Sequence, residues 1–494
     1  MSQSMDLKTL LKNVPVVKQV GANDNPYISN LAIHSQNVQP NGIFFAIQGS
    51  KADGLDYVEE AIARGASVII AERLLPHLNV HQVQVRDVRE TMAIIAQRFY
   101  GMADAKLRMV GITGTSGKTT TSWLLRHIYK QGFHKPTGLL GTLHYDLGKR
   151  ILPSLRTTPD AVSISAYLHE MLQSEYTHAI LEVSSHALTQ KRVSHLHWDT
   201  AAFTNLSLEH LDYHKDIESY FQAKRILFQS KNLKHIVVNI DDVYGQRLAD
   251  EFAGKKDLVS VGIYKQAKLR AINLRMDHQG SSFDLVTPEG IFAVKTHLLG
   301  EFNIYNCLIV LGICYAQGYD LKDAIEAIKS FTGTPGRLEN MTCTQPYGFT
   351  VYVDYAHKPE ALKRVLQTVR PLTSGNLYLV FGCGGDRDRS KRSVMARIAE
   401  SYADKSWATS DNPRTEDQEQ IFSDMKQGLQ SNDRVTFIKD RAEAIHQAFL
   451  QCKAGDCLIV AGKGHERYQE INNQLLPFDD RLVVETCFLS QKKA

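Results

Sequence analysis

The segment Gly-Thr-Ser-Gly-Lys-Thr-Thr at residues 114–120 has residue types and spacing suited to phosphate binding. It follows the apolar run 109–112 and precedes a helical pattern that starts near Ser122. In such a turn, backbone N–H groups face the anion, the lysine bridges phosphates, and a threonine hydroxyl can hold Mg²⁺. The common P-loop has glycine six residues before the lysine, whereas Ile112 stands there. The segment favours nucleotide binding, and the alternative is an ordinary glycine-rich turn between a strand and a helix.

A carboxylate and two histidines are candidate metal ligands. Glu182 lies at the end of the apolar run 178–183, and an acidic residue beside a phosphate loop is the usual second partner of Mg²⁺. The alternative is a solvated carboxylate at a strand end. His210 and His214 flank Asp212, and binding of a metal by one of these histidines is possible. We expect His214 to be structural.

Two further polar residues lie in predicted helices. Lys224 follows Tyr220 and Phe221 in a helical stretch, and its pattern alone predicts a solvated lysine. Asn303 opens the helical pattern 303–317 and is predicted to be its N-cap. Its amide group could instead face a purine, because amides pair with adenine edges.

Four polar motifs each follow a predicted strand in the last third of the chain. They are Asp354–His357, Gly382–Arg389, Asp411–Arg414 and Gly462–Glu466. In open parallel sheets, ligands bind beyond the carboxyl ends of the strands, so we expect the motifs to share one site. The turn at 384–389 suits an anion, although a charge cluster is more often a solvated surface. It is not a dinucleotide fingerprint, because Arg387 occupies the third glycine position.

The elements that position these residues alternate between strand and helix, which predicts an α/β fold of three domains. The predicted domains are residues 1–102, 103–335 and 336–494, with linkers at 101–105 and 332–336. The central domain is expected to hold a P-loop-type parallel sheet with an antiparallel flank at 269–299. The last domain is expected to be Rossmann-like.

The bulk properties exclude several classes of protein. A chain of 494 residues is too long for one core. A net charge of +4 gives no indication of nucleic-acid binding. Seven cysteines without a Cys-x-x-Cys pair predict neither a disulfide framework nor a zinc site. No apolar run approaches the ~18 residues of a membrane span, and the start of the chain lacks a signal-peptide core, so we expect a cytosolic protein.

Taken in order along the chain, the motifs resemble those of the Mur ligase family, the ATP-dependent amino-acid ligases of peptidoglycan synthesis. The resemblance covers all three predicted domains. It rests on Gly114–Thr120, Glu182–His186, His210–His214, Gly300–Asn306, Gly336–Glu339 and Asp354–Pro359. Within the family, Asp411-Asn412-Pro413-Arg414 is similar to the signature of members that add meso-diaminopimelate to UDP-MurNAc-L-Ala-D-Glu.

The resemblance implies a role for each matching residue. The catalytic residues would be Lys118, Lys224, Glu182 and His210. ATP would be bound by Gly114, Thr115, Ser116, Gly117, Lys118, Thr119, Thr120, Asn303, Arg337 and Asp354. Mg²⁺ would be held by Thr119, Glu182, His210 and Lys224, the lysine as a carbamate.

The substrates would be held by two further sets of residues. The UDP-linked substrate would contact Ile33, Ser35, Ser50, Lys51, Ala52, Arg156, Thr157, Thr158, Ser184, Gln190 and Arg192. Diaminopimelate would contact Arg387, Asp411, Asn412, Pro413, Arg414, Gly462 and Glu466. Lysine lacks one carboxylate of diaminopimelate, so an unpaired Arg414 would disfavour lysine by about 2–5 kcal/mol.

The implied reaction is ATP-dependent amide formation through an acyl phosphate, by a monomer that binds neither nucleic acid nor membrane. The three substrates would be brought into register by domain closure. Three alternatives stay open: a lysine-adding ligase, a ligase like folylpolyglutamate synthase, and a non-enzymatic P-loop binding module or NTPase switch.

Overall fold

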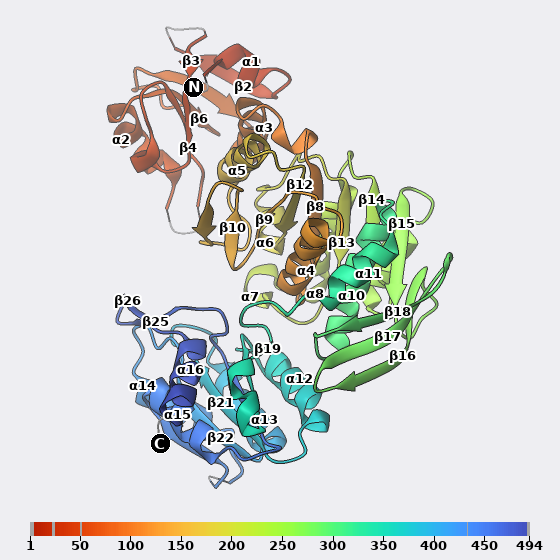
Figure 1. The fold of residues 1–494 in the computed structure, drawn as a ribbon. Helices are drawn as coiled ribbons and strands as arrows, with labels where there is room; N and C mark the ends of the chain where they lie inside the picture. Colours follow the sequence, from red (N-terminus) through yellow and green to blue (C-terminus); the bar gives the residue numbers. More distant parts are fainter. Residues whose placement is uncertain (1–3, 22–24, 50–51, 432, 492–494) are drawn as a thin grey trace. The chain divides into compact units, whose positions relative to one another are not determined.

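The computed structural model describes residues 4–21, 25–49, 52–431 and 433–491 (Figure 1). The chain forms two compact units. The first comprises Met1–Ile272, Leu285–Phe292 and Tyr305–Ile328. The second comprises Asn273–Asp284, Ala293–Ile304 and Lys329–Ala494. The α/β class predicted from the sequence is confirmed in both, whereas the three predicted domain boundaries stay a prediction.

The first unit begins with a five-stranded sheet. In sheet order its strands are β2 (Val16–Val20), β7 (His81–Val85), β6 (Ala66–Ala71), β5 (Gly42–Phe45) and β4 (Asn30–Ala32). All neighbours are parallel except β2 and β7. Alternate residues face opposite sides of a strand, so Phe44 and Phe45 enter two different hydrophobic cores. The helices α1 (Leu7–Leu11), α2 (Val58–Ala63) and α3 (Val88–Phe99) accompany this sheet.

An eleven-stranded sheet follows. In sheet order its strands are β11 (Ile151–Pro153), β10 (His144–Asp146), β9 (Thr137–Leu140), β12 (His178–Glu182), β8 (Arg108–Thr113), β13 (Thr200–Phe203), β14 (His235–Asn239), β15 (Asp257–Gly262), β16 (Leu269–Asp277), β17 (Gly280–Thr287) and β18 (Gly290–Thr296). The run from β9 to β16 is parallel. Two-residue connections join β16 to β17 and β17 to β18, and only antiparallel strands can be joined in this way. The predicted parallel sheet with its antiparallel flank is therefore present.

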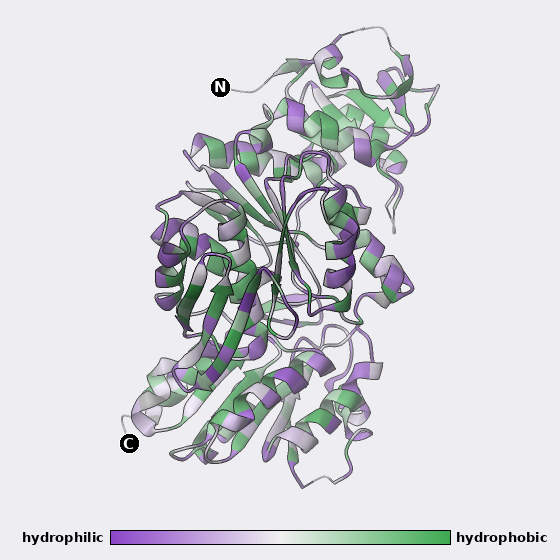
Figure 2. Cartoon of the chain, turned by 90° about the vertical axis from the view of Figure 1, so that its right-hand side faces the viewer, coloured by the Kyte–Doolittle hydropathy of each residue, from purple (hydrophilic) through white to green (hydrophobic). Residues whose placement is uncertain are grey.

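Helices α4 (Lys118–Gln131), α5 (Ala161–Gln173), α6 (Ser185–Thr189), α7 (Leu211–His214), α8 (Ile217–Arg225), α9 (Val243–Phe252), α10 (Glu301–Ala316) and α11 (Leu321–Lys329) accompany this sheet. Residues of α5, α6, α8 and α9 share one hydrophobic core with the strands. Aspartates start several helices: Asp160, Asp216 and Asp242 each accept a backbone N–H from the first turn. Figure 2 shows the green, hydrophobic strands between helices whose outer faces carry purple, hydrophilic residues.

The second unit contains a six-stranded sheet. In sheet order its strands are β19 (Glu339–Asn340), β20 (Thr350–Asp354), β24 (Cys457–Ala461), β21 (Leu377–Cys383), β22 (Lys405–Ser410) and β23 (Val435–Ile438). All are parallel except β19. Helices α12 (Pro359–Val369), α13 (Ser390–Tyr402) and α14 (Gln418–Lys426) pack into one core, and α15 (Arg441–Gln451) and α16 (Asp480–Gln491) into another. The unit is thus doubly wound, and a hairpin of β25 (Tyr468–Ile471) and β26 (Gln474–Pro477) is added to it.

One local prediction was wrong. Helix α10 begins at Glu301, so Asn303 lies inside its first turn and is not the N-cap. The helical stretch predicted around Lys224 is present as α8, which a 3-10 helix, Ile226–Gln229, follows directly. The predicted linker 101–105 includes a 3-10 helix, Ala103–Ala105, in which Asp104 is buried and accepts a hydrogen bond from the His197 N–H, and its role as a linker stays a prediction. Among the described residues, no helix has both the length and the apolarity needed to cross a membrane.

Candidate active site

The phosphate loop lies between β8 and α4, as its sequence predicts. Lys118 begins α4, and its Nζ donates hydrogen bonds to the carbonyl oxygens of Gly114 (2.7 Å) and Thr115 (3.0 Å). The lysine thus folds back over its own loop. Its ammonium lies at the start of a helix, where the backbone N–H groups favour an anion.

Both glycines of the loop are required by its geometry. Gly114 and Gly117 have φ values of +151° and +88°, in a region that L-residues with side chains rarely adopt. A Cβ at Gly114 would overlap Oγ1 of Thr204, and one at Gly117 would overlap Oδ1 of Asn306. The loop therefore packs too closely against its surroundings to accept side chains at either position.

The segment after β13 supports the phosphate loop, which the sequence did not indicate. The Asn205 side chain accepts a hydrogen bond from the Ser116 N–H (3.0 Å) and donates one to the Ser116 carbonyl (3.1 Å). Thr204 Oγ1 donates to the same carbonyl (2.7 Å). These contacts fix the backbone at the tip of the loop. Their only sequence signal was the polar pair at the end of a predicted strand.

Glu182 lies beside the phosphate loop because β12 and β8 are parallel neighbours. Its side chain is fully buried. Oε2 accepts hydrogen bonds from the hydroxyls of Thr119 (2.9 Å) and Thr142 (2.8 Å), and Oε1 accepts one from the Thr142 N–H (3.1 Å). The alternative of a solvated carboxylate is therefore wrong.

Thr119 and Glu182 are suited to Mg²⁺, which prefers oxygen ligands and is commonly held by one or two carboxylates together with substrate phosphates. Their direct hydrogen bond places a hydroxyl and a carboxylate together at the phosphate loop. Within the described part of the chain, no group of three or more His, Cys, Asp or Glu residues could hold a metal unaided. Mg²⁺ bound at Thr119 and Glu182 would complete its coordination with oxygen ligands from outside this pair, such as substrate phosphates and waters.

His210 and His214 occupy different surroundings. His210 has a left-handed backbone, with φ +57°, and its Nε2 lies 3.1 Å from the Glu209 carboxylate. His214 is buried, and its Nε2 forms a 2.8 Å hydrogen bond with Ser185 Oγ. His210 remains partly exposed and accessible, whereas the packing of His214 agrees with a structural role.

Lys224 is not solvated, contrary to its helical pattern. Its side chain is 1% exposed, on the inner face of α8. Nζ donates to the Gly114 carbonyl (2.9 Å) and lies 4.4 Å from the ring centroid of Tyr220. Burial, reinforced by the nearby Lys118 cation, lowers the pKa of Lys224 well below its usual value. The site therefore favours a neutral, nucleophilic amine.

Several residues assigned to the muramoyl dipeptide form one hydrogen-bonded group. Thr158 Oγ1 donates to the Glu182 carbonyl (2.8 Å) and receives the Ser184 N–H (3.0 Å). Arg192 donates to the Thr158 carbonyl (2.8 Å) and to Gln190 Oε1 (2.6 Å). Burial lowers the pKa of Arg192, and the nearby Arg156 cation lowers it further. Two neighbouring arginines provide an electrostatic environment suited to an anionic substrate.

Thr157 and the N-terminal residues complete the set assigned to the UDP-linked substrate. The hydroxyls of Thr157 and Thr142 lie 3.2 Å apart, which links Thr157 to the Glu182 group. Ser35 is buried and donates to Glu60 (2.7 Å), Ile33 is half-buried, and Ala52 is exposed. Ser50 and Lys51 lie outside the described residues.

The second unit carries the other three residues assigned to ATP. Asn303 Nδ2 donates to the Leu299 carbonyl (2.8 Å). Asp354 is buried at the end of β20 and accepts the N–H groups of Leu338 (2.6 Å) and Ala356 (2.7 Å). Burial raises the pKa of Asp354, opposed by the Arg337 cation, which itself stacks 4.5 Å from the Tyr355 ring.

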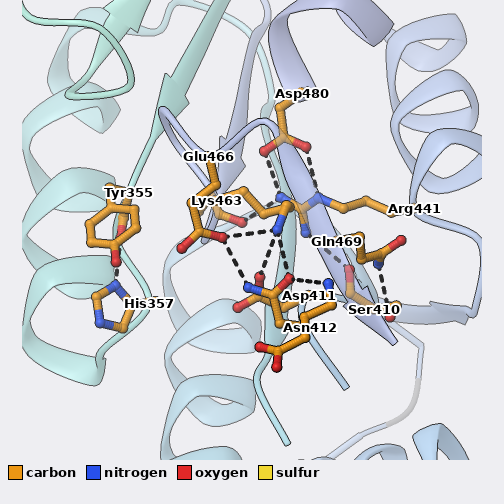
Figure 3. Close-up of polar contacts among 12 residues, drawn as sticks. Tyr355, His357, Ser410, Asp411, Asn412, Arg441, Lys463, Glu466, Gln469 and Asp480 are labelled. Atoms are coloured by element: carbon orange, nitrogen blue, oxygen red, sulfur yellow. Dashed lines mark hydrogen bonds and ion pairs between the residues drawn. The ribbon is translucent and has the colours of Figure 1, made fainter. Parts of the chain in front are cut away.

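The polar motifs at the carboxyl ends of β20, β24, β21 and β22 do follow neighbouring strands, as predicted. Figure 3 shows the resulting cluster, which we call the amino-acid cluster: Asp411, Asn412, Lys463 and Glu466. Lys463 is fully buried, and its Nζ donates to Asn412 Oδ1 (3.0 Å) and Glu466 Oε2 (3.0 Å). Asn412 Nδ2 donates to the same Glu466 oxygen (2.9 Å).

Charge in the amino-acid cluster favours a cationic ligand. Two carboxylates, Asp411 and Glu466, face the Lys463 cation, and Nζ lies 3.7 Å from Asp411 Oδ1. The Arg441 cation also interacts with both carboxylates, but it is already paired with Asp480 (2.7 Å). That Asp411 oxygen is buried without a hydrogen-bond partner. A buried acceptor without a donor is costly, so an ammonium group would be favoured here. The sequence motif contained Lys463, but nothing in it distinguished this residue from a solvated lysine.

The other residues assigned to diaminopimelate follow the carboxyl ends of β21, β22 and β24. Gly462 has φ +118°, and a Cβ there would lie 3.8 Å from the Asp411 carboxylate. Arg414 Nη1 donates to the Gly385 carbonyl (2.7 Å), and its Nε lies 2.9 Å from Glu470 Oε2. Pro413 is buried and Arg387 is exposed. An arginine and a group of hydrogen-bond acceptors thus occur together, a combination that suits an amino-acid group with its carboxylate and ammonium.

Family models of known proteins match three successive segments of the chain. The Mur ligase family catalytic domain matches residues 27–100, the Mur ligase middle domain residues 112–314, and the Mur ligase glutamate ligase domain residues 336–464.

Proteins named UDP-N-acetylmuramoyl-L-alanyl-D-glutamate–2,6-diaminopimelate ligase are similar over nearly their full length. The protein from Geobacillus kaustophilus is 42% identical, over 97% of this chain and 98% of its own. The one from Listeria monocytogenes is 39% identical, over 99% of each chain. A solved structure of a ligase of this name has a TM-score of 0.70 at 36% identity, covering 94% of this chain and 95% of its own. The chain therefore belongs to the Mur ligase family.

Proposed function

We propose that the chain is an ATP-dependent ligase that joins meso-2,6-diaminopimelate to the D-Glu γ-carboxylate of UDP-MurNAc-L-Ala-D-Glu, in peptidoglycan precursor synthesis. The near-full-length relatives carry this activity in their names. The single structural observation that carries the proposal is the amino-acid cluster beside Arg414, which offers acceptors for an ammonium and a guanidinium for a carboxylate.

Activation of the carboxylate is the first requirement. A carboxylate and an amine do not condense unaided, so the γ-carboxylate oxygen attacks the terminal phosphorus of ATP and expels ADP, giving an acyl phosphate. Phosphoryl transfer needs alignment and neutralisation of charge rather than covalent help from the protein. Lys118 would supply that charge by leaving the carbonyls of its own loop for the phosphates.

Thr119 and Glu182 would hold Mg²⁺, together with His210 and a modified Lys224. Bound there, the metal would neutralise negative charge on the phosphates. Thr142 and Ser122 keep the Glu182 carboxylate in place through hydrogen bonds, so its position does not depend on the metal.

Lys224 supports the proposed carbamate through its burial. A neutral amine attacks CO₂ through its nitrogen lone pair, forms an N–C bond and loses one proton, which leaves an anionic carbamate. Burial and the Lys118 cation both favour the neutral amine that this step needs. The carbamate oxygens would then replace a nitrogen donor with the oxygen ligands that Mg²⁺ prefers.

The second chemical step joins the amino acid. The diaminopimelate amine attacks the acyl carbon, the tetrahedral intermediate expels phosphate, and the amine loses a proton. Asp411 and Glu466 would bind an ammonium of the incoming amino acid, while Arg414 would bind a carboxylate. Holding these groups in register supplies much of the rate gain, since about 7–11 kcal/mol of a barrier can come from alignment.

Release of inorganic phosphate from ATP tests the proposal. The purified chain is incubated with Mg²⁺, ATP and the two other substrates, and each substrate is omitted in turn. We expect phosphate release only when UDP-MurNAc-L-Ala-D-Glu and meso-diaminopimelate are both present. Hydrolysis that proceeds equally without either of them would support the P-loop switch instead.

A further inference from the structure

Glu470 on β25 contacts both halves of the amino-acid site. Its N–H donates to Asn412 Oδ1 (2.9 Å), and its carbonyl accepts the Arg414 N–H (3.0 Å). Its carboxylate Oε2 lies 2.9 Å from Arg414 Nε. The Glu470 carboxylate therefore forms an ion pair with the Arg414 guanidinium, which is expected to bind a substrate carboxylate.

The ion pair places a carboxylate of the protein beside Arg414 Nε. A guanidinium binds a carboxylate bidentately through two parallel N–H groups. The Glu470 carboxylate lies at Nε as an ion pair, and the Gly385 carbonyl accepts a hydrogen bond from Nη1. A substrate carboxylate that approaches the Nε side of Arg414 therefore meets a negative charge that is already there.

The surroundings keep Arg414 in this arrangement. Its backbone is left-handed, with φ +55°, and a backbone pairing joins it to Ile471 of the same hairpin. Nη1 lies close to Gly384, where a Cβ would be 3.1 Å from it, so the absence of a side chain at Gly384 makes this position of Arg414 possible. A substrate carboxylate that binds at Nε has to compete with the Glu470 carboxylate for that position.

We propose that Glu470 is a specificity-determining residue that competes with the distal carboxylate of the incoming amino acid for Arg414. The proposal rests on the proposed function, because it assumes that Arg414 receives such a carboxylate. With lysine, which has no distal carboxylate, Arg414 keeps Glu470 as its partner and is not left unpaired. Glu470 thus weakens binding of diaminopimelate and reduces the penalty against lysine that an unpaired arginine would impose.

The test is steady-state kinetics of phosphate release for the full chain, with diaminopimelate or lysine varied at saturating ATP and UDP-MurNAc-L-Ala-D-Glu. The variant is Glu470→Gln, which removes the charge and keeps the shape. The matched control is Glu443→Gln, an exposed glutamate on α15 whose carboxylate accepts a hydrogen bond from Gln447 along its own helix. We expect Glu470→Gln to lower KM for diaminopimelate about two- to fivefold, the effect of an ion pair worth up to about 1 kcal/mol, with kcat and KM for ATP unchanged.

The use of lysine by Glu470→Gln should stay equal or fall, so that the preference for diaminopimelate rises. An unchanged or increased KM for diaminopimelate in a folded Glu470→Gln protein would overturn the proposal and assign Glu470 to orientation of Arg414. If Glu470→Gln fails to fold, Glu470→Asp withdraws the carboxylate by one methylene and should shift KM in the same direction. A wild-type chain that is inactive with diaminopimelate would instead refute the proposed function.

Discussion

The Nζ of Lys224 lies 2.9 Å from the carbonyl oxygen of Gly114, the first residue of the phosphate loop. Lys224 lies 110 positions after Gly114 in the sequence, and its side chain is buried against the phosphate loop with the Lys118 cation nearby. This relationship links the proposed carbamate to the phosphate loop by geometry as well as by family membership.

Lys224→Met should remove most of the ligase activity while making the protein more stable. Loss of a charge-stabilising group at a reaction centre costs about 100-fold or more in rate. Lys231→Met, at an exposed position, is the matched control. Short-chain carboxylates added to Lys224→Ala should restore part of the activity, and a fully active variant would refute the carbamate role.

The gain in stability depends on pH in a defined direction. The pKa of Lys224 is lower in the folded chain than its value of 10.5 in the unfolded chain. Below pH 10.5 the unfolded chain therefore holds a proton on Lys224 that the folded chain lacks, and the free energy of unfolding of the wild type falls as pH falls. Each unit of lowering costs about 1.4 kcal/mol. In bicarbonate-free buffer at neutral pH, the free energy of unfolding of Lys224→Met should exceed that of the wild type, and the difference should shrink towards pH 10. A less stable variant at neutral pH would contradict the neutral-amine assignment.

Gly117→Ala should reduce ATP affinity more than about tenfold, because a strained backbone position costs of the order of 1–3 kcal/mol. The added methyl group would also overlap Asn306 Oδ1. Gly101→Ala is the matched control, since Gly101 likewise has a positive φ, +73°, but nothing lies near its would-be Cβ. Fluorescent-nucleotide titration measures the effect, and equal losses in the two variants would show that backbone strain alone is responsible.

Glu182→Gln should raise the Mg²⁺ concentration for half-maximal activity at least about tenfold, the usual effect of altering a group that supports a metal. The amide oxygen can still accept the Thr142 N–H, so the fold should be kept. Magnesium titration of phosphate release, with circular dichroism as the folding check, measures both. An unchanged Mg²⁺ dependence in a folded variant would remove Glu182 from the metal site.

Lys463→Met should raise KM for diaminopimelate and leave KM for ATP unchanged. The cation orients Asn412 and Glu466, and loss of one partner from a buried charged group costs about 2 kcal/mol or more, roughly 30-fold. Lys453→Met, at an exposed position, controls for a general loss of charge. Equal changes in both KM values would indicate a structural role in place of a positioning one.

The sequence predicted those parts of the site that depend on local order along the chain. The phosphate loop, Glu182 and the polar strand ends follow from alternation of strands and helices, because parallel neighbours bring their carboxyl ends to one edge. Burial of Lys224 and Lys463 could not be predicted, since a lysine in a helix or loop is usually solvated and only tertiary packing encloses it. The predicted cap at Asn303 was three residues too late, because α10 begins at Glu301 and its N-cap position is therefore Gly300.

Arg414 has a partner that its sequence motif does not show. The sequence predicts that Arg414 is unpaired when lysine binds, because lysine lacks the second carboxylate of diaminopimelate. Glu470, 56 positions further along the chain, supplies a carboxylate instead. A contact between residues so far apart in the sequence depends on the path of the β25–β26 hairpin, which no sequence motif predicts.

Direct analysis of the nucleotide product tests the central claim most sharply. The purified chain is incubated with ATP, Mg²⁺, UDP-MurNAc-L-Ala-D-Glu and an equimolar mixture of meso-diaminopimelate and lysine, and the product is identified by mass spectrometry. We predict that UDP-MurNAc-L-Ala-D-Glu-diaminopimelate predominates and that Arg414→Ala loses this preference while KM for ATP is kept. A product that contains mainly lysine, or no amino acid at all, would contradict the account.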